Sequence, residues 1–414
     1  MENRHTAGVK NKSIDHAPTR SKITVLHQLC NLIPPHLVPK VARECGSGSH
    51  ARTFSHWSHL VALLHAQATH ALGLNDVCDS LRLHGGPLSA IRGATPPARN
   101  TLSHANKTRP ARIAQDVFWN LLAHLEKTHR GFGRTGRPRR LHRFRQTISI
   151  LDSTVIELVA GSMDWAKHRR RKAAAKAHVR LDLQTLLPRC VVIDTAAEHD
   201  NRRAAQLTAA LRPGEIVIAD RGYVDQDHFK ELDDRGVWWV TREKVNMVSD
   251  LLEEFPVPAG GNILQDQLVT LKKGLPVRRV TALVEVDGKE REMVFLTNNR
   301  QWSANTVADL YKSRWEIEVF FKQLKQTFQV ADFLGHSANA VRWQMWAALI
   351  LMLLLRFNAW LSDWNHSFLR LFALARSCAW QKWDWAKLLK SCGTGGGSFR
   401  MLGAPQQAFL PGFS

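Results

Sequence analysis

The stretch YKSRWEIEVFFKQLK, residues 311–325, combines two faces that suit only a helix at the margin of a core. At about 100° per residue, its apolar side chains cover an arc of about 100°, the width expected of a core-facing stripe. A neighbouring arc of roughly 80° carries a carboxylate, cations and a phenol. The apolar set is Leu310, Ile317, Phe320, Phe321 and Leu324, and the polar set is Tyr311, Arg314, Glu318, Lys322 and Lys325. The pattern predicts one helix over 311–325, with Glu318 rather than Glu316 aligned with the cations.

A solvated face with salt bridges, such as Arg314 to Glu318, is the simpler interpretation of the polar strip. Two features favour a functional one. The strip borders the apolar face instead of opposing it, so its side chains lie at a core margin. Two aspartates upstream also follow predicted strands, where a lone glutamate would find partners.

The charge of the chain favours a polyanionic partner. The 414 residues carry 57 Lys+Arg against 36 Asp+Glu, a formal charge of +21. Nucleic acid is the first candidate partner, ahead of an anionic membrane surface, because no lipidation motif is present. Residues 343–355 are apolar, but they are bounded by Arg342 and Arg356 and fall short of the ~20 residues that span a bilayer. We expect a buried helix there and no membrane association.

The cysteines and the N-terminus carry little further signal. The 6 cysteines have no CxxC spacing, which argues against a zinc cluster or a disulfide framework and is typical of a reducing compartment. The N-terminal residues are polar and lack an apolar signal core. We therefore expect a cytoplasmic protein associated with DNA.

The secondary structure predicted from the sequence pattern changes near residue 146 from helical to mixed α/β. Helical patterns with Gly and Pro breaks precede it and suggest a helical DNA-binding domain, although many helical bundles look the same. Strands are expected at 146–158, 187–194, 215–220 and 237–242, with a helix at about 201–211. We divide the chain into a disordered tail (1–22), a helical N-terminal DNA-binding domain (23–130), a basic linker (131–145), a first catalytic part (146–242), a β-rich insertion (243–300), a last catalytic part (301–365), and a C-terminal helical region with a loose tail (366–414).

Two aspartates stand at the ends of predicted strands: Asp152 in LDST and Asp220 in ADRGY. Such carboxylates project into the crevice where open α/β sheets place ligands, although either one alone could simply cap the next element. Together with Glu318 they form a set able to hold two hard divalent cations. Two ions roughly 3.5–4 Å apart activate one oxygen and stabilise another in phosphodiester chemistry.

These motifs resemble those of a known family. Tyr311, Arg314, Glu318 and Lys325 match Y-x2-R-x3-E-x6-K, the YREK signature of the DDE-type insertion-sequence transposases of family four. LDST and ADRGY resemble the two aspartate motifs of that family, and AAAKAHVRLDL (173–183) resembles its K-x-H segment. The resemblance covers roughly residues 50 to 360.

The resemblance implies a fold and an activity. The fold is α/β: an RNase H-like mixed sheet flanked by helices, interrupted by a β-rich insertion, behind an N-terminal all-helical domain. The activity is cut-and-paste transposition at terminal inverted repeats with Mg²⁺ or Mn²⁺, two ions per site, held by Asp152, Asp220 and Glu318. The implied partners are double-stranded DNA, as transposon ends and target, and a second copy of the chain in a synaptic homodimer. Tyr311, Arg314 and Lys325 would bind phosphates.

Several further residues are weaker candidates for DNA contact: Lys322, the arginines of KHRRRK (Arg169, Arg170 and Arg171), and Trp302, which could stack on a flipped base. Lys176 and His178 are expected to support the site. Two alternative functions remain open: an RNase H-like DNA nuclease without strand-joining activity, and a non-catalytic DNA-binding derivative.

Overall fold

The fold was analysed in a computed structural model of the chain. It describes residues 18–47, 53–133, 143–158, 167–168, 172–195, 198–257, 260–286, 288–327, 334–335 and 337–392. The predicted tail up to residue 17, most of the predicted basic linker and the glycine-rich end from residue 393 lie outside these ranges. Residues 18–22 of the predicted tail lie within these ranges, where Ser21 N donates to Lys382 O at 2.8 Å and Arg20 forms a β-bridge with Trp383.

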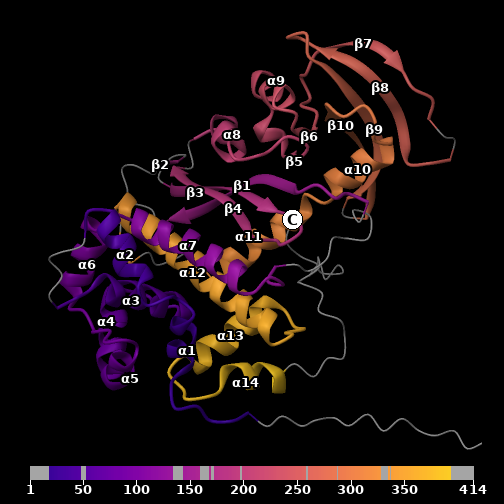
Figure 1. Cartoon of the computed structure of the whole chain (residues 1–414). Coiled ribbons are helices and arrows are strands. Elements are labelled where there is room, and N and C mark those ends of the chain that lie inside the picture. The colour runs from indigo at the N-terminus through magenta and orange to yellow at the C-terminus, as the bar shows by residue number, and fades with distance from the viewer. Residues whose placement is uncertain are drawn as a thin grey trace, which may run out of the picture.

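A helical lobe is built from both ends of the chain (Figure 1). Thr24 and Ser55 cap the first turns of α1 and α3 with their hydroxyls, as N-cap residues do. Helix α4 ends at Leu83, and Gly85 and Gly86 begin the next, short helix α5. The N-terminal helices are α1 (Val25–Asn31), α2 (Leu37–Glu44), α3 (His56–Thr69), α4 (Leu74–Leu83), α5 (Gly85–Ala90), α6 (Arg99–Thr108) and α7 (Arg112–Thr128); the C-terminal ones are α12 (Ala338–Leu361), α13 (Phe368–Cys378) and α14 (Trp385–Cys392).

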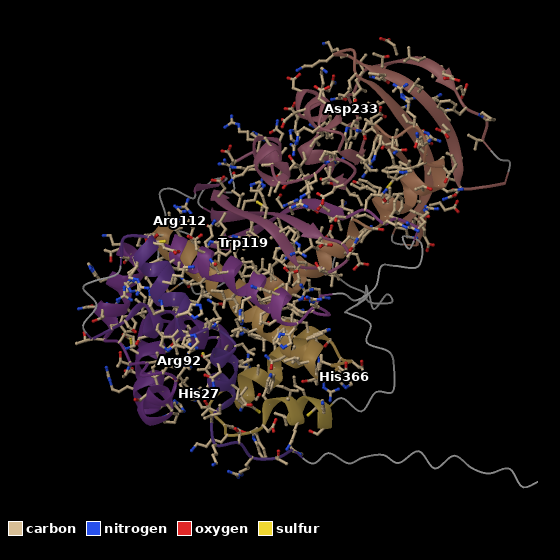
Figure 2. The ribbon with its side chains drawn as sticks, in the orientation of Figure 1. His27, Arg92, Arg112, Trp119, Asp233 and His366 are labelled. Carbon is tan, nitrogen blue, oxygen red and sulfur yellow. The ribbon has the colours of Figure 1, made fainter. Side chains whose placement is uncertain are left out.

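The long helix α12 is the centre of this lobe. It packs against α3, α6, α7 and α13. Trp119 of α7, labelled in Figure 2, meets Trp346 of α12 at 5.9 Å between ring centroids. By length and composition alone it could cross a membrane, and in the described part of the chain it is the one helix that could. Its apolar window is 83% buried, however, which confirms the predicted buried helix.

The described strands form one 10-stranded mixed sheet in the order β2-β3-β1-β5-β6-β10-β9-β8-β7, with β4 paired to β3. β1 is antiparallel to β3 and parallel to β5, and β5 is parallel to β6. The strands are β1 (Ile148–Leu158), β2 (Lys167–His168), β3 (Lys172–Asp182), β4 (Pro188–Thr195), β5 (Ile216–Ala219), β6 (Trp238–Arg242), β7 (Ser249–Glu254), β8 (Ile263–Leu271), β9 (Pro276–Val286) and β10 (Lys289–Thr297).

Alternating residues of the central strands divide between two cores, as the period of 2 requires. Ile150, Ile218 and Val240 join the core shared with the helical lobe. Leu151, Val217 and Trp239 instead pack under α8 (Asn201–Thr208) and α9 (Gln226–Asp234). Helices therefore cover both faces of the sheet, and the fold is mixed α/β with a helical N-terminal region, as the sequence predicts (Figure 1).

The predicted β-rich segment 243–300 supplies β7–β10, and these strands continue the main sheet. β10 pairs with β6 from Phe295↔Arg242 to Thr297↔Val240, so the sheet runs unbroken from the central strands into the added hairpins. The buried pair Arg278 and Asp266 joins β9 to β8 at 2.6 Å. The segment is thus an extension of one sheet edge (Figure 1).

The single helix predicted over 311–325 is wrong, because two helices meet there. α10 (Ala304–Lys312) ends before Ser313, and α11 (Trp315–Thr327) starts after Arg314. The backbone bonds tighten to three-residue spacing, from Arg314 N to Tyr311 O and from Ile317 N to Arg314 O. The Ser313 hydroxyl also donates to the Asp309 carbonyl at 3.0 Å, a local bond that competes with the helical ladder.

Candidate active site

Asp152 and Asp220 lie next to each other where a parallel strand pair stops. The β1–β5 register ends at Leu151↔Ala219, and each aspartate is the next residue of its chain. β1 itself continues to Leu158 along β3, so the prediction that Asp152 ends its strand is wrong on that side. On the β5 side the pairing does end, and this frees the Asp152 side chain to project from the sheet beside Asp220.

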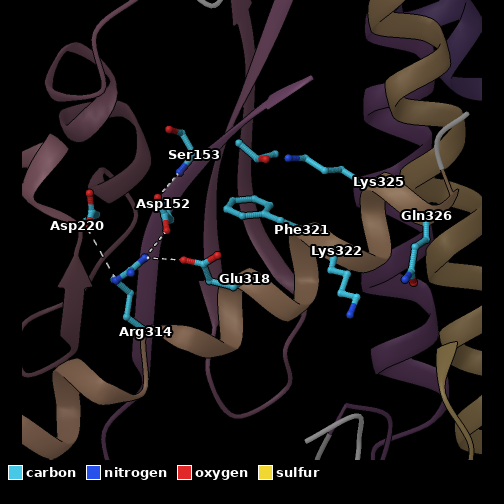
Figure 3. Close-up of a pocket in the computed structure, with 10 residues that line it drawn as sticks. Asp152, Ser153, Asp220, Arg314, Glu318, Phe321, Lys322, Lys325 and Gln326 are labelled. Atoms are coloured by element: carbon cyan, nitrogen blue, oxygen red, sulfur yellow. Dashed lines mark hydrogen bonds and ion pairs between the residues drawn. The ribbon is translucent and has the colours of Figure 1, made fainter. Parts of the chain in front are cut away.

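Glu318 reaches the same place from α11. The buried apolar face of α11, including Ile317 at 0% exposure and Phe320 at 1%, holds the helix against the sheet and α12. Glu318 lies in the first turn, beside this face, with its carboxylate toward the aspartates (Figure 3). The apolar stripe predicted from the sequence is therefore what positions Glu318.

The Arg314 guanidinium lies among the three carboxylates (Figure 3). Its Nη1 donates to Asp152 Oδ2 at 2.6 Å and to Glu318 Oε1 at 3.4 Å, and its Nε lies 3.8 Å from Asp220 Oδ1. The Asp152 and Glu318 oxygens are thus no farther apart than the sum of those first two distances. Three chain segments distant in sequence converge on one cation.

A pocket of about 600 Å³ opens in front of this cluster. Its polar lining comes from β1, the end of β5 and α11, and it places basic side chains beside carboxylates. The lining residues are Asp152, Ser153, Thr154, Asp220, Arg314, Glu318, Phe321, Lys322, Lys325 and Gln326. Lys322 and Lys325 are exposed on the same helix as Glu318. The sequence pattern placed Phe321 in the apolar set, and it did not single out Ser153, Thr154 or Gln326.

Burial dominates the electrostatics of the cluster. It raises the pKa of Asp152 to about 7, helped by Asp220 and Glu318, while Arg314 and the Ser153 amide limit the rise. Burial also raises the pKa of Tyr311 to about 12. For Arg314 burial acts to lower the pKa, but Asp152, Tyr311 and Asp220 outweigh it and the net pKa is raised. The arginine therefore stays charged, and Asp152 is held closer to neutrality than an exposed carboxyl.

The remaining residues predicted to contact DNA fall into three groups. Tyr311, at the end of α10, donates to Asp220 Oδ1 at 3.4 Å and so belongs to the cluster. Trp302 does not line the pocket; its ring packs against Phe144 at 5.6 Å and Trp238 at 6.2 Å, and its carbonyl accepts from Arg278. Arg169, Arg170 and Arg171 lie outside the described residues.

Lys176 and His178 lie behind the aspartates on β3. Lys176 Nζ donates to Glu198 O at 3.0 Å and to Asp200 Oδ1 at 3.3 Å. His178, fully buried, lies 3.1 Å from the Tyr223 hydroxyl, and burial lowers its pKa to about 4. Sequence reasoning missed their shared partner, Asp200, because its only signal was its place after a strand in EHDN.

The donor set suits a hard divalent cation, since three carboxylates of one pocket offer only oxygen ligands. As they stand, however, no three acidic, His or Cys side chains in the described ranges are close enough to hold one ion together. The Arg314 guanidinium occupies the space between them. A divalent cation between the carboxylates would therefore require Arg314 to move aside.

Comparison with known proteins gives two family matches. Residues 143–354 match the model described as "Transposase DDE domain", which spans half of the chain. Residues 21–91 match a domain of unknown function, DUF4372. The first match covers every strand and helix that contributes to the pocket.

Curated relatives point the same way. A putative transposase, y4zB, of Sinorhizobium fredii is 31% identical over 70% of this chain and 80% of its own length. A probable transposase for insertion sequence element IS5377 of Geobacillus stearothermophilus is 29% identical over 68% and 71% of the two chains. A putative transposase for insertion sequence element IS4SA of Synechocystis is 24% identical over 62% and 70%.

Proposed function

The chain belongs to the DDE transposases of insertion sequences, and from that premise we propose that Asp152, Asp220 and Glu318 are its metal ligands and catalytic residues. They would hold Mg²⁺ or Mn²⁺, two ions per site, for cut-and-paste transposition at terminal inverted repeats. DNA transposition by a metal-dependent DNA-cleaving enzyme is the activity of the family. The residue roles, the ion count and the cut-and-paste pathway are the proposal.

The convergence of the three carboxylates on Arg314 is the observation that carries the assignment. Such a cluster of like charges is costly unless a cation neutralises it. Bound divalent ions would activate an attacking oxygen and stabilise the leaving one at the scissile phosphate. The chain itself provides the ligands, fixes their separation through the end of the β1–β5 pair, and supplies cations for the DNA.

Arg314 would exchange partners when metal and DNA bind. Its guanidinium, released from the carboxylates, presents a planar fork that matches two phosphate oxygens. Lys322 and Lys325 line the pocket about one and two helical turns beyond Glu318 on α11. There they would contact the next phosphates of the DNA strand. Tyr311, a hydroxyl donor already in contact with Asp220, would add a further contact to DNA.

The mixed sheet with helices on both faces supports an RNase H-like core made of residues 146–242 and 301–365, with 243–300 inserted between them. The helical region at 23–130 would bind DNA, as would the basic segments 131–145 and Arg169–Arg171. We place the protein in the bacterial cytoplasm, on transposon ends and target DNA. We expect a homodimer in the synaptic complex.

The test is cleavage and joining of a DNA that carries paired inverted-repeat ends, with Mg²⁺ or Mn²⁺. Glu318→Gln should lower cleavage by about 10²–10³-fold or more, the scale for losing one electrostatic stabiliser, with DNA binding retained. Glu316→Gln on the same helix, outside the pocket lining, is the matched control and should cleave normally. Cleavage by Glu318→Gln at the control rate would refute the ligand assignment.

Two other functions are outcomes of the same assay. Nicked DNA with no joined product from the unaltered chain would identify an RNase H-like nuclease. DNA binding without cleavage in either metal would identify a non-catalytic DNA-binding derivative.

A further inference from the structure

Asp200 stands immediately before α8, where an aspartate ordinarily caps the helix, yet its carboxylate makes no capping bond to α8. The side chain is 25% exposed and turns toward β1 and β3 instead. It also does not line the pocket that holds Asp152, Asp220 and Glu318. Neither helix capping nor metal ligation therefore accounts for its orientation.

The first oxygen of Asp200 is held by two side chains, and a third lies near it. Oδ1 accepts from Ser153 Oγ at 2.8 Å and from Lys176 Nζ at 3.3 Å, and His178 Nδ1 lies 3.4 Å away. Lys176 is 13% exposed and His178 is buried. The ammonium of Lys176 gives the carboxylate a fixed counter-ion, so its charge is satisfied within this network.

The second oxygen of Asp200 rests against Gly222. A Cβ placed on Gly222 would lie 2.7 Å from Oδ2, closer than real Cβ atoms come to their neighbours. Gly222 belongs to the one-turn helix η3 (Arg221–Tyr223) that directly follows Asp220. Because Gly222 has no side chain, this turn can lie directly against the Asp200 carboxylate.

Two of the residues that Asp200 contacts, Ser153 and Gly222, also donate backbone hydrogen bonds to the two aspartates. Ser153 N donates to Asp152 Oδ1 at 2.7 Å, and Gly222 N donates to Asp220 Oδ2 at 3.4 Å. The Asp200 carboxylate thus touches both backbone turns that fix the aspartate side chains. A shift of Asp200 would move either Ser153 or Gly222 and change the separation of the two aspartates.

We infer that Asp200 is a positioning residue that sets the separation of Asp152 and Asp220 through Ser153 and Gly222, and so sets their affinity for divalent cations. The inference rests on the proposed function, in which these aspartates are metal ligands. Asp200 itself binds no ion. Groups that orient metal ligands typically contribute 10–100-fold to metal affinity, and we expect a loss of about that size when the carboxylate is removed.

The experiment is calorimetric titration of Mn²⁺ into the full-length chain, without DNA. Asp200→Asn should bind Mn²⁺ about 10–100-fold more weakly than the unaltered chain. The matched control is Asp194→Asn, which removes the charge from the 2.6 Å contact that Arg203 of α8 makes to β4, at a residue that belongs to neither aspartate turn. It should lower the melting temperature and leave the Mn²⁺ affinity unchanged.

A second variant tests the contact between Asp200 and Gly222 by changing Gly222. Gly222→Ala should weaken Mn²⁺ binding because the new methyl displaces the Asp200 carboxylate, and this variant serves if Asp200→Asn does not fold. In an Asp200→Ala background the methyl has room, so Gly222→Ala should add no further loss. Additive losses in the double variant would contradict the contact.

The Mn²⁺ titrations distinguish failure of the positioning role from failure of the proposed metal site. Wild-type Mn²⁺ affinity in folded Asp200→Asn, or an equal loss in Asp194→Asn, would overturn the positioning role alone, provided that Asp152→Asn abolishes binding. If Asp152→Asn binds Mn²⁺ normally, the proposed metal site is wrong and the role of Asp200 is overturned with it.

Discussion

Replacing Asp152 by asparagine should make the protein more stable while removing its activity. Burial raises the pKa of this carboxyl from 3.8 to about 7, and the side chain is only 15% exposed. A pKa that is higher in the folded state means that the folded chain binds more protons between those two pH values. Stability therefore falls as the pH rises from about 4 to about 7.

The size of the effect follows from that shift. Each pKa unit corresponds to 1.36 kcal/mol, so ionised Asp152 costs the folded state up to about 4 kcal/mol above pH 7. Asparagine keeps an oxygen for the Ser153 amide, which now lies 2.7 Å from Asp152 Oδ1, and carries no charge. We expect a gain of about 2–4 kcal/mol at pH 8 and almost none at pH 4.

The assay is chemical denaturation with EDTA at pH 4 and pH 8, with Asp250→Asn on the exposed edge strand β7 as a control of equal charge change. Added Mn²⁺ should then narrow the stability difference between Asp152→Asn and the unaltered chain. A ligand at 100 times its dissociation constant stabilises the native state by about 2.7 kcal/mol, and the unaltered chain would gain this while Asp152→Asn would not. A destabilised Asp152→Asn at pH 8, or an equal Mn²⁺ gain in both proteins, refutes the reasoning.

Three further predictions concern the core, acid stability and DNA. Phe320→Ala should cost about 3–5 kcal/mol in the free energy of unfolding, because the ring is 1% exposed, whereas the partly exposed Val319→Ala should cost much less in the same denaturation assay. Burial lowers the pKa of His65 to about 4 from 6.5, so the protein loses stability as the pH falls below about 6.5. His65→Leu should remove up to about 3 kcal/mol of that loss, measured by denaturation at pH 4 and pH 7. An unchanged pH dependence in the variant would contradict this prediction. Lys322→Gln and Lys325→Gln should each reduce the salt dependence of DNA binding by about one phosphate contact; an unchanged slope of log affinity against log salt would exclude the contact.

The sequence predicted those parts of the site that local patterns encode. Apolar residues at helical spacing placed Phe320 in the core and Glu318 beside it, and short β-branched runs located β1 and β5 with their aspartates. The order of the paired strands, by contrast, is a long-range property. Nothing in residues 289–297 indicates that they pair with β6 and continue the main sheet.

Other differences between the predicted and the observed structure concern single backbone regions and contacts. The break after Lys312 coincides with the Ser313 hydroxyl bond to a carbonyl four residues earlier, and a helical wheel does not register such a bond. Strand β3 contains an alanine-rich run that favours helix by propensity, and pairing with β1 and β4 overrides that preference. The sequence analysis did not identify Asp200 as a site residue, because its inferred role depends on contacts with Ser153 and Gly222. These residues are its neighbours in space but not in sequence.

The central claim is that residues 152, 220 and 318 share divalent cations, and the most direct measurement is anomalous diffraction from crystals of the chain grown with Mn²⁺. The account predicts manganese peaks about 2.0–2.2 Å from oxygens of all three side chains, with the Arg314 guanidinium moved out of the cluster. Manganese bound elsewhere, with Arg314 still bridging the three carboxylates, would contradict it.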